Sequence, residues 1–543
     1  MSNNMYYVCK YTPLELLESY GLEMERLDPE PETLECGSAL SHPNLCGYGR
    51  AVLKEVLEGR VKSLFLVDCC DVCRRIYDVL KSEGTMDFLF LMYLPHKKGP
   101  WEVAHLKKEL LRLNDALAAY TGRTFDEKKA RELWRLNIET FYSERIEADH
   151  IVLTGAHGGC GLKKQIEKVT DLPVEDDTCT GNRVLRREEG GEFFEDYGEA
   201  LLAQKSPCMR MQFEGEDRVG SLGTICHTIK FCDYYGFQYK ALRDEEERLL
   251  KIETDCTSQS EGQIRTRLEA FSELIRPKSL KKERSGDRRY VCGIDSGSSS
   301  TNAVILDEDK NIVASSIIPT GGGADKSGNR AFREVLDRAG LGEDDIARVI
   351  TTGYGRDNLN LSNSSITEIS CHAKGARHLY PEVRTIIDIG GQDSKVIVLD
   401  ESGDVTNFVM NDKCAAGTGR FLETMAKTLE LSLEEMSDLG LKWHKPVTIS
   451  STCAVFAESE VVSLIASNTE IPDIINGLNR SIASKTASLA KRAKGGAPYM
   501  MTGGVSNNLG VVKALEDALS EILRVPEEAQ ICGALGAALF ALE

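Results

Sequence analysis

The chain has 543 residues and a formal net charge of −19 at pH 7, which predicts several domains and disfavours nucleic acid or an anionic membrane surface as the main partner. The first residues, MSNNMYYVCKY, lack a signal-peptide pattern, and the longest apolar run, FLFLMYL, is too short to span a bilayer. We therefore expect a cytoplasmic protein with no membrane segment.

The 17 cysteines are unevenly distributed, because twelve precede residue 260 and five follow it. In a large chain without a secretion signal, free thiols or metal ligands are expected in place of a disulfide framework. The two halves of the chain therefore predict two kinds of unit.

Cysteines in the first half stand at the ends of apolar stretches, in the segments NLCGYGR, LVDCCDVCRR, VEDDTCTGNR, SPCMRM, IKFCDYY and ETDCTSQSEGQ. Proteins with α/β sheets place their sites at the carboxyl ends of strands, so we expect thiols at strand ends. Helices are predicted over residues 101–120 and 126–142. The pattern indicates an α/β domain over residues 1–275, with two lobes.

These cysteine segments resemble the catalytic subunits of 2-hydroxyacyl-CoA dehydratases and the compact relatives that hold a double-cubane cluster. The resemblance covers about residues 5–275. It implies an iron-sulfur centre whose protein ligands are Cys46, Cys70 and Cys232, with one iron left open for substrate.

Other thiols of this half leave alternatives open. The extra cysteines supply further ligands for a double cubane or are structural, and they are Cys9, Cys69, Cys179 and Cys208. The CxxC pattern from Cys70 to Cys73 also fits a zinc or thioredoxin-like site. His157 and a later histidine, His372, are expected in loops as ordinary polar residues.

Residues 276–289, RPKSLKKERSGDRR, are basic and almost without apolar side chains. This composition predicts a solvated linker, although its charge would also allow docking on an acidic surface. The linker separates the first half from a second domain over residues 290–543.

The second domain opens with a strand, a Gly/Ser turn and another strand, YVCGIDSGSSSTNAVILDEDK. Small residues let backbone N–H groups approach a phosphate, and a carboxylate at the turn holds Mg²⁺ through water. The residues concerned are Asp295, Gly297, Ser298, Ser299 and Thr301.

The strand-turn-strand pattern recurs in TIIDIGGQDSKVIVLD, with Gly390, Gly391, Gln392 and Asp393 at the turn. Two such hairpins are the duplicated signature of the actin, Hsp70 and sugar-kinase superfamily. The adenosine loop of that superfamily is matched by MMTGGVSNN, and its final connecting helix by CGALGAALFALE. The loop residues are Thr502, Gly503 and Gly504.

Within that superfamily the segments TTGYGR, EISCHAKGA, NDKCAAGTGRFLE and STCAVFAESEV resemble the activator of 2-hydroxyacyl-CoA dehydratases and the ATPase subunits of benzoyl-CoA reductase. The resemblance spans residues 290–543. It implies a homodimer through the ATPase domain, with Cys414 and Cys453 of each chain binding one shared 4Fe-4S cluster. Each of these cysteines stands at the start of a predicted helix, whose positive end favours a thiolate. The chain departs from the family at Asn302, where a lysine is usual.

The sequence therefore predicts ATP-driven transfer of a low-potential electron from the shared cluster to the centre in the first domain, a chemistry of anaerobic metabolism. Asp295, Gln392 and Asp393 would position Mg²⁺ and the attacking water. Ferredoxin or flavodoxin would supply the electron, and a separate dehydratase subunit is a further candidate partner. The outcome is dehydration of a 2-hydroxyacyl-CoA or reduction of a small unsaturated molecule. A small-molecule kinase and a regulatory ATPase of the same fold are the alternatives, and both would be colourless.

Overall fold

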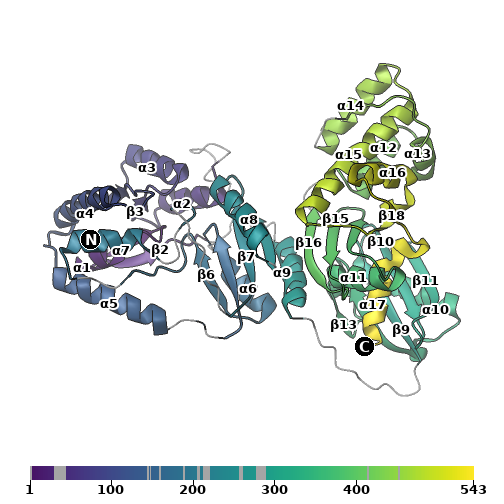
Figure 1. Cartoon of the computed structure of the whole chain (residues 1–543), viewed down its shortest axis with the longest axis horizontal. Coiled ribbons are helices and arrows are strands. Elements are labelled where there is room, and N and C mark those ends of the chain that lie inside the picture. Colours follow the sequence, from purple (N-terminus) through teal and green to yellow (C-terminus); the bar gives the residue numbers. More distant parts are fainter. Residues whose placement is uncertain are drawn as a thin grey trace. The chain divides into compact units, whose positions relative to one another are not determined.

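The structure is a computed structural model that describes residues 3–29, 45–143, 146, 148–157, 161–186, 190–204, 208–211, 220–246, 248–255, 261–276, 289–411, 415–449 and 453–543. The chain divides into two compact units, Met1–Phe271 and Ser272–Glu543 (Figure 1). Most of the expected linker lies outside the described residues. Among the described helices, none is both long enough and apolar enough to cross a bilayer.

Two four-stranded parallel sheets form the first unit. Their strand orders are β2-β1-β3-β4 and β6-β5-β7-β8, so the two sheets have the same topology and confirm two α/β lobes. The strands are β1 (Asn4–Tyr7), β2 (Glu23–Arg26), β3 (Ser63–Val67), β4 (Phe88–Met92), β5 (His150–Gly155), β6 (Val174–Thr178), β7 (Ser221–Ile229) and β8 (Leu249–Thr254). In each sheet the chain changes direction beside the first strand, which is where parallel sheets bind ligands.

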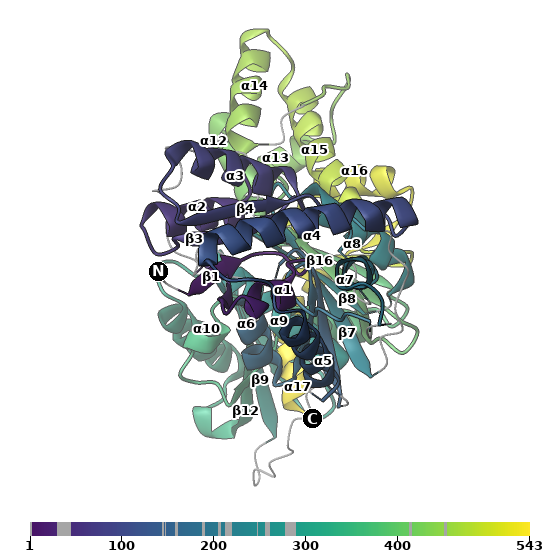
Figure 2. The same cartoon turned by 90° about the vertical axis from the view of Figure 1, so that its left-hand side faces the viewer.

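Helices cover these sheets, and their apolar side chains pack against the strands. In α3, the buried residues Cys73, Ile76 and Leu80 recur at helical spacing, and both α3 and α4 pack on β4 (Figure 2). The helices of this unit are α1 (Leu14–Ser19), α2 (Gly47–Leu57), α3 (Asp71–Glu83), α4 (Pro100–Thr121), α5 (Glu127–Ser143), α6 (Leu162–Thr170), α7 (Phe193–Leu202), α8 (Asp233–Glu245) and α9 (Glu261–Ile275).

A buried ion pair links distant segments of this unit. Both guanidinium Nη atoms of Arg183 donate to the Glu15 carboxylate at 2.6 Å, and Asn137 donates to it at 2.9 Å. The Glu15 side chain is fully buried. Although burial acts to raise it, the Arg183 charge holds the pKa of Glu15 below its usual value.

Replacing Arg183 by methionine should lower the free energy of unfolding by about 3–5 kcal/mol at pH 7, because Glu15 would remain buried without a countercharge. The loss should shrink as the pH falls, since protonated Glu15 needs no partner. Denaturant unfolding at two pH values measures both effects. The control is Arg75→Met, which removes only exposed ion pairs and should cost less than about 0.5 kcal/mol. Equal losses in the two variants would contradict the argument.

The second unit repeats one five-stranded sheet. The orders are β11-β10-β9-β12-β13 and β16-β15-β14-β17-β18, and the matching pairs have the same parallel or antiparallel sense. The strands are β9 (Tyr290–Ser296), β10 (Ser300–Leu306), β11 (Ile312–Pro319), β12 (Ile346–Thr352), β13 (Ser364–Ser365), β14 (Thr385–Ile389), β15 (Ser394–Leu399), β16 (Val405–Asn411), β17 (Tyr499–Thr502) and β18 (Leu523–Arg524). The duplicated actin, Hsp70 and sugar-kinase-like fold is confirmed.

Two helices cross closely between these sheets. Cβ atoms added at Gly536 in α17 and at Gly375 in α11 would lie 1.8 Å and 2.2 Å from backbone oxygens of the facing helix, so only glycine permits the crossing. The helices of this unit are α10 (Ala324–Ala339), α11 (Glu368–Leu379), α12 (Gly419–Thr428), α13 (Leu433–Leu439), α14 (Ala454–Ala466), α15 (Ile471–Arg492), α16 (Leu509–Leu519) and α17 (Cys532–Ala541).

Candidate functional site

Both predicted phosphate hairpins are present, and their turns meet. The Gly297 N–H donates to the Ser300 carbonyl, and the Gly390 N–H donates to the Asp393 carbonyl, each at 3.0 Å. A Cβ atom added at Gly391 would lie 1.9 Å from the Ser299 hydroxyl. The two glycine turns therefore form one place where backbone N–H groups can surround a phosphate.

Two other residues that were predicted to belong to these turns differ in their exposure to solvent. Gln392 is exposed at the tip of the second turn. Thr301 is fully buried, and its hydroxyl lies 3.0 Å from both the Thr320 and the Ser327 hydroxyls. Its hydroxyl is therefore engaged on the side of β11 and α10.

Four carboxylates gather behind the turns around one buried lysine. The Lys395 ammonium lies 2.8 Å from Asp393, 3.3 Å from Asp388 and 3.4 Å from Glu368. Burial raises the pKa of Asp295, with Asp388 and Asp393 adding to the rise. Burial also raises the pKa of Glu368 to about 7, against the opposing charge of Lys395. Such a carboxyl is suited to accept a proton near neutral pH.

The predicted adenosine loop begins beside this cluster. The Thr502 hydroxyl donates to Asp388 at 2.9 Å, and Gly503 has a φ of 84°. A Cβ atom added at Gly503 would lie 2.5 Å from the Ile389 carbonyl, so the turn requires glycine. The loop residue Gly504 opens the short helical turn Gly504–Asn507.

The prediction that His372 lies in a loop is wrong, because it belongs to α11 and is buried. Its Nδ1 atom lies 3.6 Å from an Asp388 oxygen and 3.4 Å from the Thr502 hydroxyl. Sequence reasoning also assigned no role to Lys395 or Glu368. The motif EISCHAKGA contained Glu368 and His372, and their helical spacing of four was the signal that could have paired them.

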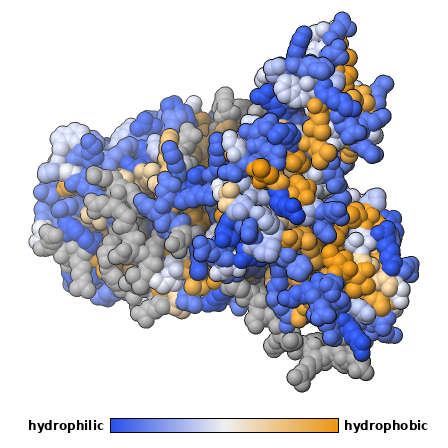
Figure 3. Space-filling view, turned by 45° about the vertical axis from the view of Figure 1, so that its right-hand side comes forward, coloured by the Kyte–Doolittle hydropathy of each residue, from blue (hydrophilic) through white to orange (hydrophobic). Residues whose placement is uncertain are grey.

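Cys453 is exposed and is the N-cap of α14, as its position predicted. Its proposed partner, Cys414, lies outside the described residues. The face of α14 next to Cys453 carries exposed apolar side chains, Val455 at 66%, Phe456 at 70% and Val462 at 53%, and apolar side chains reach the surface of the second unit in Figure 3. An exposed apolar face is typical of a surface that another protein covers.

In the first unit, the three cysteines predicted as ligands share one local geometry. Cys46, Cys70 and Cys232 are the N-caps of α2, α3 and α8, in that order. The partial positive charge of a helix N-terminus stabilises a thiolate. Thiols at helix N-termini therefore occur in the first unit as well as at Cys453 of the second.

One of these thiols lies in a close group. The Cys73 sulfur is 3.4 Å from that of Cys69 and accepts from that of Cys70 at 3.6 Å, and all three sulfurs lie within 4.8 Å of one another. The hydrogen bond with Cys69 raises the pKa of Cys70 to about 12. Because crowded thiols resist ionisation together, a bound cation would reverse this shift.

Further thiols lie close by. Burial raises the pKa of Cys179, and the neighbouring thiols that add to the rise are Cys208, Cys69 and Cys232. The Cys208 sulfur lies 3.2 Å from the Tyr235 hydroxyl. The structure thus brings Cys69, Cys179 and Cys208 near the predicted ligands Cys70 and Cys232. It also adds Cys73, which the sequence offered only as half of a CxxC pair.

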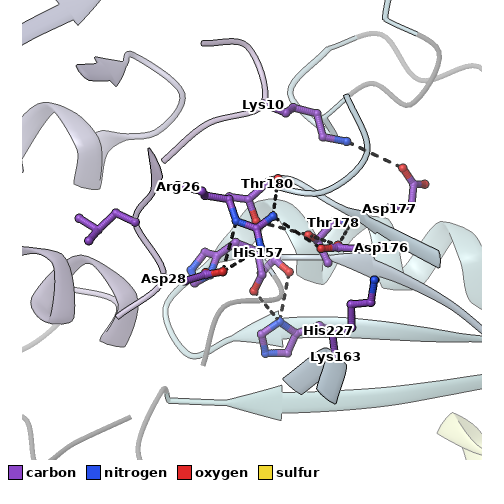
Figure 4. Close-up of polar contacts among 12 residues, drawn as sticks. Lys10, Arg26, Asp28, His157, Lys163, Asp176, Asp177, Thr178, Thr180 and His227 are labelled. Atoms are coloured by element: carbon purple, nitrogen blue, oxygen red, sulfur yellow. Dashed lines mark hydrogen bonds and ion pairs between the residues drawn. The ribbon is translucent and has the colours of Figure 1, made fainter. Parts of the chain in front are cut away.

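Polar side chains form a second cluster at the strand ends of this unit (Figure 4). Arg26 donates to the Asp28 carboxylate at 2.7 Å and to the Thr180 carbonyl at 3.0 Å, and pairs with Asp176 at 3.8 Å. Lys10 pairs with Asp177 at 3.8 Å. Positive and negative groups balance here, which argues against a site for a free anion.

His157, which follows β5, is buried, and neither ring nitrogen has a hydrogen-bond partner among the described residues. Its ring centroid is 3.4 Å from that of Tyr48, and burial lowers its pKa well below the usual value. His227 instead is hydrogen-bonded at both nitrogens, to the Ala156 and His157 carbonyls and to Thr254. His227 therefore has a structural role.

Each of the two units matches a known protein family. Residues 292–541 match the BadF/BadG/BcrA/BcrD ATPase family, and residues 9–140 and 138–275 match the 2-hydroxyglutaryl-CoA dehydratase D-component. The 2-hydroxyisocaproyl-CoA dehydratase activator of Clostridioides difficile is 45% identical over 47% of this chain and 95% of its own length. The (R)-2-hydroxyglutaryl-CoA dehydratase activating ATPase of Acidaminococcus fermentans is 48% identical over 46% of this chain and 96% of its own length.

Solved structures of similar proteins cover the same region. The activator of the 2-hydroxyisocaproyl-CoA dehydratase from Clostridium difficile with bound ADPNP is 45% identical over 47% of this chain and 94% of that chain, with a TM-score of 0.45. The Acidaminococcus fermentans (R)-2-hydroxyglutaryl-CoA dehydratase component A is 47% identical. The match covers 47% of this chain and 98% of that chain, with a TM-score of 0.46.

Proposed function

Because this chain belongs to the BadF/BadG/BcrA/BcrD ATPase family and carries a 2-hydroxyglutaryl-CoA dehydratase D-component domain in front of it, we propose that its ATPase drives electron transfer between two iron-sulfur sites. The observation that carries the proposal is that the meeting glycine turns of the second unit occur in one chain with helix N-cap thiols in both units. Residues 290–543 would be the motor and residues 1–275 the electron acceptor, in a cytoplasmic protein of anaerobic metabolism.

In the motor, each hairpin turn would surround part of the nucleotide's phosphate chain with N–H groups. Asp295, Asp393 and Gln392 would hold Mg²⁺ and orient the attacking water. Glu368 has a pKa raised to about 7 and would accept the proton of that water. Thr502, Gly503 and Gly504 would hold the adenosine.

The electron-donating site would be built from Cys414 and Cys453 of two chains. Each chain supplies two thiolates and a cubane needs four, so a twofold axis through the cluster is the simplest completion. A 4Fe-4S cluster bound there supplies one-electron transfer at low potential. The exposed apolar face of α14 supports a homodimer through the ATPase domain, and ferredoxin or flavodoxin would supply the electron.

The accepting site would use Cys46, Cys70 and Cys232. The donor set fits an iron-sulfur centre, because soft thiolates predominate and further thiols of Cys69, Cys73, Cys179 and Cys208 lie near Cys70 and Cys232. These extra thiols allow a second cubane. The recipient chemistry would be dehydration of a 2-hydroxyacyl-CoA or reduction of a small unsaturated molecule, and a separate dehydratase subunit would be a further partner.

Replacing Cys453 by serine should remove about two irons per chain, since the shared cluster contributes half of a cubane to each chain. Nucleotide binding should survive, because the phosphate turns and the thiol are separate elements. Iron analysis and nucleotide titration of the anaerobically purified full chain measure both. Cys292→Ala, at a buried thiol of β9, is the control and should retain all iron. A loss of about four irons per chain would contradict a shared cluster, and no loss would contradict the ligand role.

A further inference from the structure

Positions 302 and 395 are equivalent in the internal repeat of the second unit. In the first hairpin, Asn302 on β10 stands directly across from Asp295 on β9. In the second hairpin, Lys395 on β15 stands directly across from Asp388 on β14. Because the two sheets have the same strand order and sense, each residue is the cross-strand partner of the carboxylate that precedes its phosphate turn.

The two positions hold side chains of different chemistry. The Asn302 amide nitrogen donates to the Gln530 carbonyl at 3.0 Å, so the side chain is tied to the segment before α17 and brings no charge. The Lys395 ammonium is buried and contacts three carboxylates, those of Asp393, Asp388 and Glu368. The first hairpin therefore has no cation at this position, while the second hairpin has one.

Lys395 is also placed where the two turns meet. Asp393, whose carboxylate is the closest to the Lys395 ammonium, also closes the second turn, because its backbone carbonyl accepts from the Gly390 N–H. A Cβ atom added at Gly390 would lie 3.0 Å from the Asp393 carboxylate. The next residue of that turn, Gly391, lies against Ser299 of the first turn. A charge on Lys395 therefore acts on any phosphate held between the turns, at short range and with little screening by water.

We propose that Lys395 is a catalytic residue for ATP hydrolysis and supplies, from the second hairpin, the phosphate-directed cation that position 302 does not supply in this chain. In the reaction the water oxygen bonds to the γ-phosphorus, the bond from the γ-phosphorus to the bridging oxygen breaks, and ADP, phosphate and one proton are released. Lys395 makes and breaks no covalent bond. Its positive charge would stabilise the negative charge on the transferring phosphoryl group from its place beside the second turn. The inference rests on the ATP-hydrolysing part of the proposed function only.

The test measures kcat and KM for Mg·ATP hydrolysis in the full chain and in three variants, Lys395→Met, Asn302→Lys and the combination of both. Lys395→Met should lower kcat by about 100-fold, with a smaller change in KM. The combination should regain about tenfold in kcat, because a lysine at the equivalent position restores a cation on the other side of the phosphate. Asn302→Lys alone should leave kcat unchanged or raise it. Lys374→Met, which removes a partly exposed lysine paired with Glu543, is the control and should hydrolyse ATP like the parent.

A kcat within about threefold of the parent in Lys395→Met, or no gain from adding Asn302→Lys, would overturn the inference. If Lys395→Met does not fold, Lys395→Arg is measured in its place, because it keeps the charge but changes its geometry. A folded arginine variant with kcat reduced about tenfold supports phosphate contact, and a parent-like kcat refutes it. A parent chain that hydrolyses no ATP would instead refute the proposed function itself.

Discussion

Replacing Asp295 by alanine is expected to abolish the proposed ATP-dependent reduction of the first unit while both proposed iron-sulfur sites remain assembled. Asp295 is half-buried beside the hairpin turns, and a Cβ atom added at Gly533 of α17 would lie 2.4 Å from its carboxylate. Losing the carboxylate proposed to organise Mg²⁺ should lower the hydrolysis rate by about 1,000-fold. Phosphate release measures the hydrolysis, and optical spectroscopy with ATP and a strong reductant follows the electron.

The same variant should not be less stable at pH 7. Burial raises the pKa of Asp295, and Asp388 and Asp393 add to the rise. A carboxyl whose pKa is higher in the folded state stabilises the fold only while it is protonated, and this stability is lost as the pH rises through the folded-state pKa. Removing the carboxyl therefore relieves repulsion at neutral pH, and the melting temperature should stay the same or rise.

Asp309→Ala, at an exposed carboxylate of the turn between β10 and β11, is the control for Asp295→Ala and should keep full activity. If Asp295→Ala reduces the first unit at the parent rate, ATP hydrolysis does not drive the electron, and the motor proposal fails. If both activity and melting temperature collapse, the effect is structural and the catalytic assignment is wrong.

Replacing Cys70 by serine is the second change with a large expected effect, loss of most of the iron in the first unit. Cys70 is the N-cap of α3, and its sulfur lies with those of Cys69 and Cys73. A serine hydroxyl remains protonated where a thiolate would bind iron, so the centre loses a ligand from its most crowded side. The loss should be about four irons per chain for one cubane and about eight for a double cubane.

Cys226→Ala is the matched control, because Cys226 is a buried thiol in β7 of the same unit and lies outside the predicted ligand set. It should retain nearly all iron. Cys46→Ser and Cys232→Ser should behave like Cys70→Ser. A parent protein that carries zinc in its first unit and is colourless after removal of the motor cluster would end the electron-acceptor proposal and favour the CxxC alternative.

The sequence by itself determined the local elements of both units. Glycine turns between two β patterns predicted the phosphate hairpins, since only small residues allow those turns and the strands have a period of two. A cysteine at the start of a predicted helix indicated an N-cap thiol at Cys453, which has that geometry. In the first unit, cysteines that were predicted at strand ends are N-caps as well. Each of these features depends on residues within a few positions of one another.

Only the tertiary structure decided which distant residues meet. Lys395 reaches Glu368 across 27 positions of the chain, Thr502 reaches Asp388 across 114, and Arg183 reaches Glu15 across 168. No local period encodes such pairs, because they depend on strand order and on how closely helices such as α11 and α17 cross. The wrong loop prediction for His372 and the omission of Cys73 from the thiol group were local misses instead, because His372 lies four residues after Glu368 in α11 and Cys73 lies three residues after Cys70. Burial then shifted the pKa values of the carboxylates and thiols, because the fold removes these groups from water and their charged forms become less favourable.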